Sequence, residues 1–506
     1  MPTLRDVARL AGVSTMTVSR VVNESRDVKA ETRARVERAI ADLGFVPSEA
    51  GRLLAQQKSR TKMSLTRCNS GEAVDDLSDQ PIVKGKLALR PATGRRDLSQ
   101  ASSRLSGNTV RTVLRIVRAT QPISRVDLAR RLEVNRSTVS GIVSPLIASG
   151  VLRESAPEEA AVHRRGRPPI GLTLSSDRSF FIGVNIGVRR TQVGAAITDG
   201  RMLAEESFDT PSDSNNALEQ IRSVVGRLRA SLPERSLVSI GVSVPGPTDA
   251  GRRKLLLAPH LGWRDVPVAD ALIENDPGSP NSGKGVPVIV ENDATAAAIY
   301  EARRLLRAPT TGAEDNFILV RAGTGIGVGL VLGGEVYRGS GTDRGLLGEF
   351  GHMTIVAGGD LCACGNRGCW EVYASAAGAA SIYLAAGGNA KGETPPRFIQ
   401  IVARAREGEL RAQTALARIG ENLGIGISNL ITGLGVSRVV ISGRIVHGWS
   451  LIRKSLEAVV AQTMAGRLSN WSIEPGQPTG AGLGGAVEVA TDHYLTELAR
   501  STRAAA

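Results

Sequence analysis

The sequence predicts an α/β body at residues 176–506, preceded by two small helical domains at residues 1–60 and 105–175 and by a linker at residues 61–104. Both small domains place apolar residues at helical spacing, whereas the body contains short strands of Val, Ile and Phe. Residues 1–170 hold 30 Lys and Arg against 17 Asp and Glu, so +13 of the net charge of +14 lies there. A basic front on a nearly neutral body indicates a polyanion-binding part and a body with another task.

Length and composition limit the class of protein. A chain of 506 residues with 42% hydrophobic residues is expected to form about three domains with buried cores. The most apolar stretch, residues 317–336, contains Arg321 and several glycines, so no membrane span is expected. Nothing resembles a signal peptide, and the four cysteines are few and mostly clustered. We therefore expect a cytoplasmic protein in a reducing compartment, without membrane contact.

The first 60 residues predict a helix-turn-helix. Thr3 and Ser14 are suited to cap two consecutive helices, and Gly12 permits the turn between them. The inward-facing residues of these helices are expected to be Val7, Leu10, Ala11, Val18, Val21 and Val22. A third amphipathic helix is predicted from Ala30 to Leu43. A generic three-helix domain is the alternative, but the basic charge favours nucleic acid.

This segment closely resembles the DNA-binding head of the LacI family. The matching residues include Asp6-Val7-Ala8, Ala11-Gly12-Val13-Ser14, Thr17-Val18-Ser19-Arg20-Val21-Val22-Asn23, Glu31-Thr32-Arg33 and Leu43-Gly44-Phe45. The resemblance implies that Thr15, Met16 and Arg20 read the major groove of double-stranded DNA and that Leu54 of a hinge helix enters the minor groove. It also implies a symmetric homodimer, or a higher even oligomer, on a near-palindromic operator.

Residues 105–175 predict a second helix-turn-helix with a wing. Helices are expected at residues 110–119 and 124–132 and again after Val134, where Val139, Ile142, Val143 and Leu146 face inward. Strands are expected at residues 151–154 and 171–174, joined through the basic segment 164–169, which is either a DNA-contacting wing or a solvated turn. The linker before this domain reads as flexible, and its Cys68 has no predicted role.

The second domain resembles the winged helix-turn-helix that precedes the sugar domain in repressors of the ROK family. Arg136, Ser137 and Thr138 are its candidate DNA contacts. Pro145 departs from an ordinary recognition helix, because proline removes a backbone hydrogen bond and can kink the axis. This domain is therefore expected either to bind DNA poorly or to serve mainly as a spacer and dimer element.

Three of the four cysteines lie close together in the body. Cys362, Cys364 and Cys369 follow His352 by no more than seventeen positions. Three thiolates and one imidazole fill the four positions of a tetrahedral structural zinc, so we expect Zn²⁺ here. Reduced thiols in a glycine-rich loop are the alternative. Glu349 and Glu371 bracket these ligands and are suited to accept hydrogen bonds from a polyol.

The body resembles the ROK family of repressors, open reading frames and sugar kinases nearly from end to end. Its strands end in Asn292-Asp293 and in the glycine-rich turn Gly323-Thr324-Gly325-Ile326-Gly327. The resemblance implies a two-lobed, actin-like sugar-kinase fold. It implies that His352, Cys362, Cys364 and Cys369 hold zinc and that Gly323, Thr324, Gly325 and Gly327 form a phosphate loop. It also implies that Asn292, Asp293, Glu349, His352 and Glu371 contact a sugar, with Asp293 as general base in the kinases.

The first phosphate loop departs from the kinase pattern. Family kinases carry Asp-x-Gly-Gly-Thr, whereas this chain has Asn185-Ile186-Gly187-Val188-Arg189, which lacks the metal-binding acid. His260 also replaces an asparagine that is common at the sugar in kinases; it is either a simple loop histidine or a determinant of sugar preference. These features favour a regulator that binds a hexose or derivative without phosphorylating it. The alternatives are an ATP-dependent sugar kinase with DNA-binding heads and a docking platform for another protein.

Overall fold

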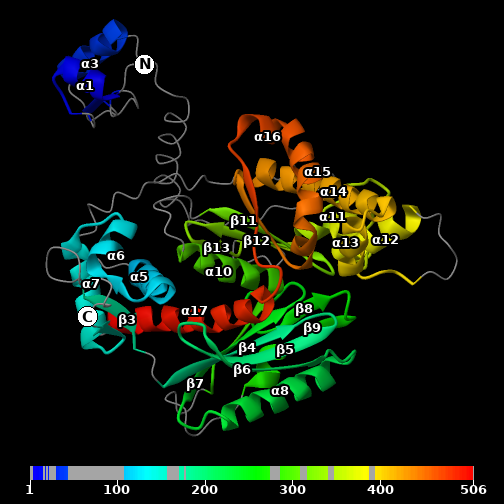
Figure 1. Ribbon diagram of the computed structural model, residues 1–506. Coiled ribbons are helices and arrows are strands. Elements are labelled where there is room, and N and C mark those ends of the chain that lie inside the picture. The colour runs from blue at the N-terminus through cyan, green and yellow to red at the C-terminus, as the bar shows by residue number, and fades with distance from the viewer. Residues whose placement is uncertain are drawn as a thin grey trace, which may run out of the picture. The chain divides into compact units, whose positions relative to one another are not determined.

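The computed structural model describes residues 4–14, 17–18, 21, 30–43, 107–155, 170–175, 178–273, 285–307, 316–339, 347–386 and 394–504. The chain forms two compact units, Met1–Arg90 and Pro91–Ala506. Figure 1 shows their helices and strands. The predicted linker, the cap at Thr3, Val22 and Cys68 lie outside the described residues.

The first unit contains helices α1 (Leu4–Ala11) and α3 (Ala30–Leu43). Gly12 turns the chain after α1 with a φ of 64°, and the Ser14 hydroxyl accepts a hydrogen bond from the Thr17 backbone N–H at 3.2 Å, as a helix cap does. The small core contains Val7, Ala8, Ala11, Val18, Val21, Val36 and Ala39. The prediction that Leu10 shares this face is wrong, because Leu10 is 53% exposed. So short a helix buries only the narrow stripe that faces α3.

The second unit begins with a winged helix-turn-helix. Its helices are α5 (Gly107–Thr120), α6 (Arg125–Arg131) and α7 (Arg136–Ala148), and its strands are β1 (Ile123–Ser124), β2 (Leu152–Ser155) and β3 (Gly171–Leu174). The strands form an antiparallel sheet in the order β1-β3-β2, as a wing requires. The predicted inward residues Val139, Ile142, Val143 and Leu146 are all buried. Helix α7 continues through Pro145 for three more residues to Ala148, so the proline does not end it.

The body consists of two lobes with the same strand order. The first sheet runs β6 (Met202–Asp209), β5 (Arg190–Ile197), β4 (Ser179–Ile186), β7 (Ser236–Val244), β10 (Val288–Asn292). The second runs β13 (Glu335–Tyr337), β12 (Ile326–Leu332), β11 (Phe317–Ala322), β14 (Arg438–Ser442), β15 (Ser472–Pro475). In each lobe three antiparallel strands precede two strands that add in parallel to the first. This repeated topology is the predicted two-lobed fold.

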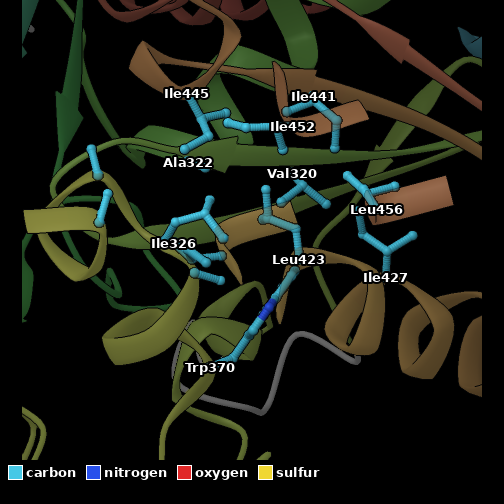
Figure 2. Packing of buried hydrophobic residues seen from close by; sticks show 14 of the residues in the cluster. Val320, Ala322, Ile326, Trp370, Leu423, Ile427, Ile441, Ile445, Ile452 and Leu456 are labelled. Atoms are coloured by element: carbon cyan, nitrogen blue, oxygen red, sulfur yellow. The ribbon is translucent and has the colours of Figure 1, made fainter. Parts of the chain in front are cut away.

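Helices cover both sheets. In the first lobe, α8 (Ser214–Ala230) packs on one face, near the hairpin β8 (Leu255–Ala258) and β9 (Trp263–Val266) and the short α9 (Val268–Leu272). In the second lobe the covering helices are α11 (Trp370–Ala374), α12 (Ala376–Ala386), α13 (Phe398–Arg406), α14 (Leu410–Leu434), α15 (Trp449–Gln462) and α16 (Met464–Leu468). Figure 2 shows Trp370 and Leu423 packed beneath the strand that carries Val320 and Ala322. This core anchors α11, which carries Glu371.

Helix α17 (Ala481–Ala504) connects the parts of the second unit. It lies against β4 and β7 of the first lobe and against α10 (Asp293–Leu306), and its later turns contact α5 of the winged domain (Figure 1). The approach to the sheet is close: a Cβ at Gly241 would lie 2.0 Å from the Ala486 carbonyl oxygen, so β7 needs glycine there. Leu495 and Ala499 are buried in the core of the winged domain. That domain therefore completes its core with the last helix of the body.

Candidate functional site

A cavity of about 390 Å³ opens where the two lobes meet. Its wall is built from the turn after β4, the turn after β11, the ends of β7 and β10, and the first residues of α17. The strands therefore deliver their polar terminal residues to one place, as expected for an α/β fold. All five residues predicted to contact a sugar line this cavity: Asn292, Asp293, Glu349, His352 and Glu371.

Asn292 is held by four hydrogen bonds. Its side-chain oxygen accepts from the backbone N–H groups of Ala294 and Thr295 and thereby caps α10. Its amide nitrogen donates to the Gly246 carbonyl and to Glu349 Oε1, each at 3.2 Å. The residue thus fixes the relation between the start of α10 and Glu349, which lies in the 3₁₀ helix η3 (Glu349–His352).

The carboxyl of Glu349 has a strongly raised pKa. Burial raises its pKa to about 7, with repulsion from Asp293 and then Glu371 adding to the effect. Its second oxygen lies 3.7 Å from His352 Nε2. At neutral pH this carboxyl can either donate or accept a hydrogen bond, which suits the hydroxyl groups of a polyol because each can do both.

Glu371 connects three parts of the site. One of its oxygens accepts a hydrogen bond from the Ile326 backbone N–H at 2.9 Å, and the other lies 3.0 Å from His260 Nε2. The hydrogen bond to Glu371 raises the pKa of His260 above its usual value, although burial opposes the shift. His260 lines the cavity beside the predicted sugar contacts and is therefore more than a loop histidine without a partner.

His352, Cys362, Cys364 and Cys369 form a compact cluster. One potential ligand atom from each residue lies within 4.8 Å of all the others. The Cys364 and Cys369 sulfurs are 3.8 Å apart, and the Cys362 sulfur lies 3.6 Å from His352 Nδ1. Tetrahedral zinc with Zn–S bonds of about 2.3 Å separates two sulfurs by roughly 3.8 Å, so the donor set fits the ion in type and in spacing.

The surroundings of this cluster disfavour the thiolate form of its cysteines. Burial, and then the neighbouring Cys364 and Cys362, raise the pKa of Cys369 to about 12, and burial also raises the pKa of Cys362. A bound dication offsets this effect because it favours the thiolate form. The arrangement can therefore hold a metal.

The glycine-rich turn after β11 packs against Glu371. A Cβ at Gly325 would lie 2.0 Å from Glu371 Oε2, and a Cβ at Gly327 would lie 2.7 Å from the Ala294 side chain. Close packing therefore accounts for both glycines. Gly323 and Thr324 line the cavity as the predicted phosphate loop requires, but the glycines alone do not indicate a nucleotide.

The cavity wall also carries basic side chains, and one of them, Arg321, lies with its Nε 3.5 Å from Asp293 Oδ2. Arg189 follows β4, Arg321 lies on β11, and Arg444 begins the 3₁₀ helix η4 (Arg444–Gly448); all three line the cavity, and we call them the arginine cluster. Arg321 and Arg444 were not among the site residues predicted from the sequence. The signal for Arg321 was a charged residue inside the apolar strand Phe317–Ala322. Asn185 also lies here, with its amide nitrogen 3.1 Å from Gln192 Oε1.

The predicted DNA contacts lie in two places. Thr15, Met16, Arg20 and Leu54, together with the basic segment 164–169, are outside the described residues. Arg136, Ser137 and Thr138 form the exposed first turn of α7. This position at the start of the third helix suits a recognition helix.

Among the helices that the structure describes, none has the length and apolar character needed to cross a membrane.

Comparison with known families gives two matches. The ROK family model matches residues 181–493, and the model for bacterial regulatory proteins of the lacI family matches residues 3–48. The two matches cover the body and the first head, respectively.

Curated relatives include repressors and kinases. The xylose repressor of Bacillus subtilis is 28% identical over 363 residues, which is 71% of this chain and 88% of the relative. The DNA-binding transcriptional dual regulator NagC of Escherichia coli is 25% identical and covers 69% of this chain and 83% of its own. A glucokinase of Streptomyces coelicolor is 32% identical, but over only 38% of this chain and 56% of the enzyme. The two regulators thus align over more of the chain than this kinase.

The fold of this chain is similar to that of a solved structure over most of both chains. The crystal structure of a ROK family transcriptional regulator, a homolog of the E. coli MLC protein, has a TM-score of 0.62 at 22% identity. It covers 79% of this chain and 99% of the other. The predicted combination of a lacI-type head with a two-lobed body is confirmed by these matches.

Proposed function

The chain belongs to the ROK family, and we propose that it is a sugar-responsive, DNA-binding transcription regulator of the repressor type. Its heads bind a double-stranded operator, and its body binds a hexose or a derivative. Support comes from the lacI-type head and from the repressors among the relatives that match most of the chain. A homodimer is part of this proposal, since paired heads read the two halves of a palindromic site.

One observation carries the proposal for the body. Asn292, Asp293 and Glu349 converge on one end of the cavity, but the first phosphate turn presents Asn185 and Arg189 where kinases of this family carry an acid and a threonine. A kinase uses that acid to place its metal and phosphates. The residues at the sugar end are suited to recognition, whereas the described residues of the first phosphate turn include no anionic group for the metal. We propose that the body binds its ligand without turnover.

The proposed metal is a structural zinc held by His352, Cys362, Cys364 and Cys369. Zinc would supply a fixed tetrahedral centre between η3 and α11. The chain's own residues do the recognition: Glu349 and His352 lie on η3, and Glu371 lies two positions after Cys369 on α11. The cluster therefore orders the two short helices that carry sugar-contacting groups.

Helix α17 provides a physical route from the sugar to the winged domain. Ala481 and Gly482 line the cavity, and Leu495 and Ala499 of the same helix lie in the core of the winged domain. A ligand changes DNA affinity only through different affinities for two conformations of the body. Closure of the lobes over a sugar, with α17 moving as a rigid element, would supply that difference.

The test combines ligand binding with operator retention in the full chain. Titration calorimetry with a panel of sugars should identify at least one that binds, and the same sugar should change retention of a promoter fragment in a gel-shift assay. The proposal would be refuted if the protein retained no DNA under any condition. It would also be refuted if no bound sugar changed the retention of DNA.

An active sugar kinase remains the second candidate, because Asp293 and the glycine-rich turn are both present in the cavity. A coupled assay of ATP turnover with the same sugars separates the two functions. Turnover on the order of 1 per second, typical of kinases, would identify an enzyme.

A further inference from the structure

We propose that three arginines of α5 couple the docking of the winged domain to the separation of the two lobes. Arg111, Arg115 and Arg118, which we call the α5 arginines, contact both lobes, and a change of lobe separation would break part of these contacts. The inference deepens the proposed function and rests on it, because a regulator needs a conformational change of the body that reaches its DNA-binding part.

The α5 arginines lie in a row on one face of α5. Their spacing of i, i+4 and i+7 places three long cationic side chains along about 10 Å of the helix. Another face of the same helix carries Val113 and Leu114, which are buried in the core of the winged domain. Helix α5 therefore belongs to the winged domain on one side and presents a row of charges on another.

The first two arginines bind the second lobe. Arg111 Nη2 pairs with Glu335 Oε2, and Arg115 Nη1 lies 2.6 Å from the other oxygen of the same carboxylate. Arg115 Nη1 also donates to the Gly334 carbonyl at 3.2 Å. Gly334 lies in the turn between β12 and β13, and Glu335 is the first residue of β13. Two guanidinium groups thus hold this turn of the second lobe.

The last arginine binds the first lobe. Arg118 Nε donates to the Thr198 carbonyl at 2.5 Å, and Thr198 lies in the turn between β5 and β6. The other nitrogens of Arg118 pair with Glu488 of α17, a helix that packs on β4 and β7 of the first lobe. This end of α5 is therefore fixed to the first lobe.

Arg115 contacts a carboxylate from each lobe. Its Nε lies 3.2 Å from Asp492 of α17, while its Nη1 binds Glu335 of the second lobe. Burial alone would lower the pKa of Arg115, but Asp492 and Glu335 outweigh burial and raise the pKa above its usual value. One guanidinium group therefore joins the two lobes through charge-assisted contacts.

The two turns that α5 binds occupy equivalent places in the two lobes. In each sheet the first three strands are antiparallel, and the turn that meets α5 joins the second strand to the third: β5 to β6 in one lobe and β12 to β13 in the other. Rotation of one lobe against the other changes the distance between equivalent points of the two lobes. A helix that contacts both turns therefore fits one lobe separation better than others.

Helices α10 and α17 connect these contacts to the cavity. Helix α10 packs on β12 of the second lobe, α17 packs on the first sheet, and the two helices pack against each other (Figure 1). Asp293 and Ala481, their first residues, line the cavity. Their later turns meet α5, where Arg303 pairs with Glu488 and Arg307 Nε donates to the Ala119 carbonyl at 3.2 Å.

The length of these helices sets the reach of the coupling. The residues of α10 and α17 that contact α5 lie about 15 Å along the helices from the residues at the cavity. A ligand that changes how α10 and α17 meet at the cavity would therefore move the partners of the α5 arginines as well. The winged domain would then lose part of its contacts with the body.

A direct ion pair between the lobes lies beside the α5 arginines. Arg338, the residue after β13, donates to Glu291 of β10 at 2.8 Å, and Arg252 lies 3.0 Å from the same oxygen. Loss of the α5 contacts should therefore widen the range of lobe separations and not part the lobes completely. A docking contact without any coupling would behave differently: its loss would loosen α5 and leave the lobe separation unchanged.

Double electron–electron resonance on the full chain tests the proposal without any ligand. Spin labels attached to p-acetylphenylalanine in place of Gln220 on α8 and Lys454 on α15 report the distance between exposed positions of the two lobes and leave the cysteines unmodified. Glu335→Gln should broaden the distance distribution, and Arg111→Gln should broaden it to a smaller extent. The double variant should be no broader than Glu335→Gln alone, because the two changes remove the same contact.

Hydrogen exchange on the same variants measures the docking of α5. The amides of α5 should exchange about two- to fivefold faster in Glu335→Gln, the effect of losing a partly exposed ion pair. Glu474→Gln is the matched control, because it removes an ion pair with Arg438 that lies wholly within the second lobe. It should change neither the distance distribution nor the exchange of α5.

The proposal is overturned if Glu335→Gln keeps the distance distribution of the wild type, whether or not α5 exchanges faster. It is also overturned if Glu474→Gln broadens the distribution as much. Arg111→Gln provides the same test if Glu335→Gln does not fold. No sugar or operator enters these measurements, so the regulator function can fail in its own assay while the coupling through α5 stands, and the reverse.

Discussion

Arg118 of α5 and Glu488 of α17 form a buried ion pair where the winged domain meets the body. Their side chains are only 5% and 3% exposed, and Arg118 Nη2 donates to Glu488 Oε1 at 3.1 Å. Arg303 of α10 pairs with the same carboxylate. A second link joins Arg115 of α5 to Asp492 of α17 at 3.2 Å. The winged domain is therefore joined to the body by buried charges as well as by apolar packing.

Replacing Glu488 should be costly. Burial alone would raise the pKa of this carboxyl, but Arg118 and Arg303 outweigh that effect and hold the pKa below its usual range. Glu488→Gln leaves two guanidinium groups without their charge partner, and removal of one member of a buried pair costs about 3–5 kcal/mol. We expect a clear drop in the thermal midpoint of the full chain at pH 7, measured by calorimetry.

The pH dependence follows from the lowered pKa. Because the folded-state pKa lies below the unfolded value of about 4.3, the stabilisation is complete above that value and is lost as the pH falls through the folded pKa. The midpoint difference between wild type and Glu488→Gln should be constant from pH 6 to pH 8 and shrink below about pH 4. Glu497→Gln, in an exposed pair on the same helix, should have little effect at any pH. Equal effects of the two substitutions would argue against the buried pair.

A further prediction concerns the zinc content of the protein. Cys364→Ser should release about one zinc per chain, because a thiolate is replaced by a poor ligand in a four-residue cluster. Metal content measured by mass spectrometry after gel filtration checks this. Cys68→Ser is the matched control and should retain the ion. Full retention by Cys364→Ser would contradict the Cys₃His assignment.

Much of the fold could be predicted from local patterns. The helix at Ala30–Leu43 was predicted with its observed bounds, and the four inward residues of α7 are all buried, because apolar spacing directly reports which face is covered. The wing strands were predicted at residues 151–154 and 171–174, and β2 and β3 lie within one residue of these bounds. The prediction that Leu10 is buried was wrong, because apolar periodicity in a short helix does not determine how wide the buried face is.

The rest depended on contacts between distant residues. Glu488 and Arg118 are 370 positions apart. The residues around each give no sequence signal that predicts the ion pair between them. The arginine cluster combines Arg189, Arg321 and Arg444 from three segments that are far apart in the sequence. In the sequence Arg189 was notable only for replacing a threonine, whereas in the structure it belongs to a shared basic wall. Such sites form only where the two lobes pack together, and local periodicity in the sequence does not predict that packing.

Two substitutions can separate the contributions of the two predicted DNA-binding domains to operator binding. Arg20→Ala should abolish the operator footprint, since Arg20 is a proposed major-groove contact within the residues that match the lacI family model. Arg136→Ala, in the exposed first turn of α7, should leave that footprint in place if the winged domain is mainly a spacer. Footprints of both variants at several salt concentrations also report lost phosphate contacts, each of which lowers the salt slope by about 1. An unchanged footprint for Arg20→Ala would defeat the assignment of the first head.

His260 offers a pH-dependent test of the sugar end. Its hydrogen bond with Glu371 raises its pKa, so the folded state favours the protonated imidazole. The resulting stabilisation is complete below the unfolded pKa of about 6.5 and is lost as the pH rises through the folded pKa. The thermal midpoint of the wild type should therefore exceed that of His260→Asn by more at pH 6 than at pH 8.5. In a Glu371→Gln background, with zinc content verified, the same substitution should show no such dependence, because the acceptor charge is gone. A pH-independent difference in the wild-type background would show that the imidazole does not depend on Glu371, and the predicted sugar preference would then need another determinant.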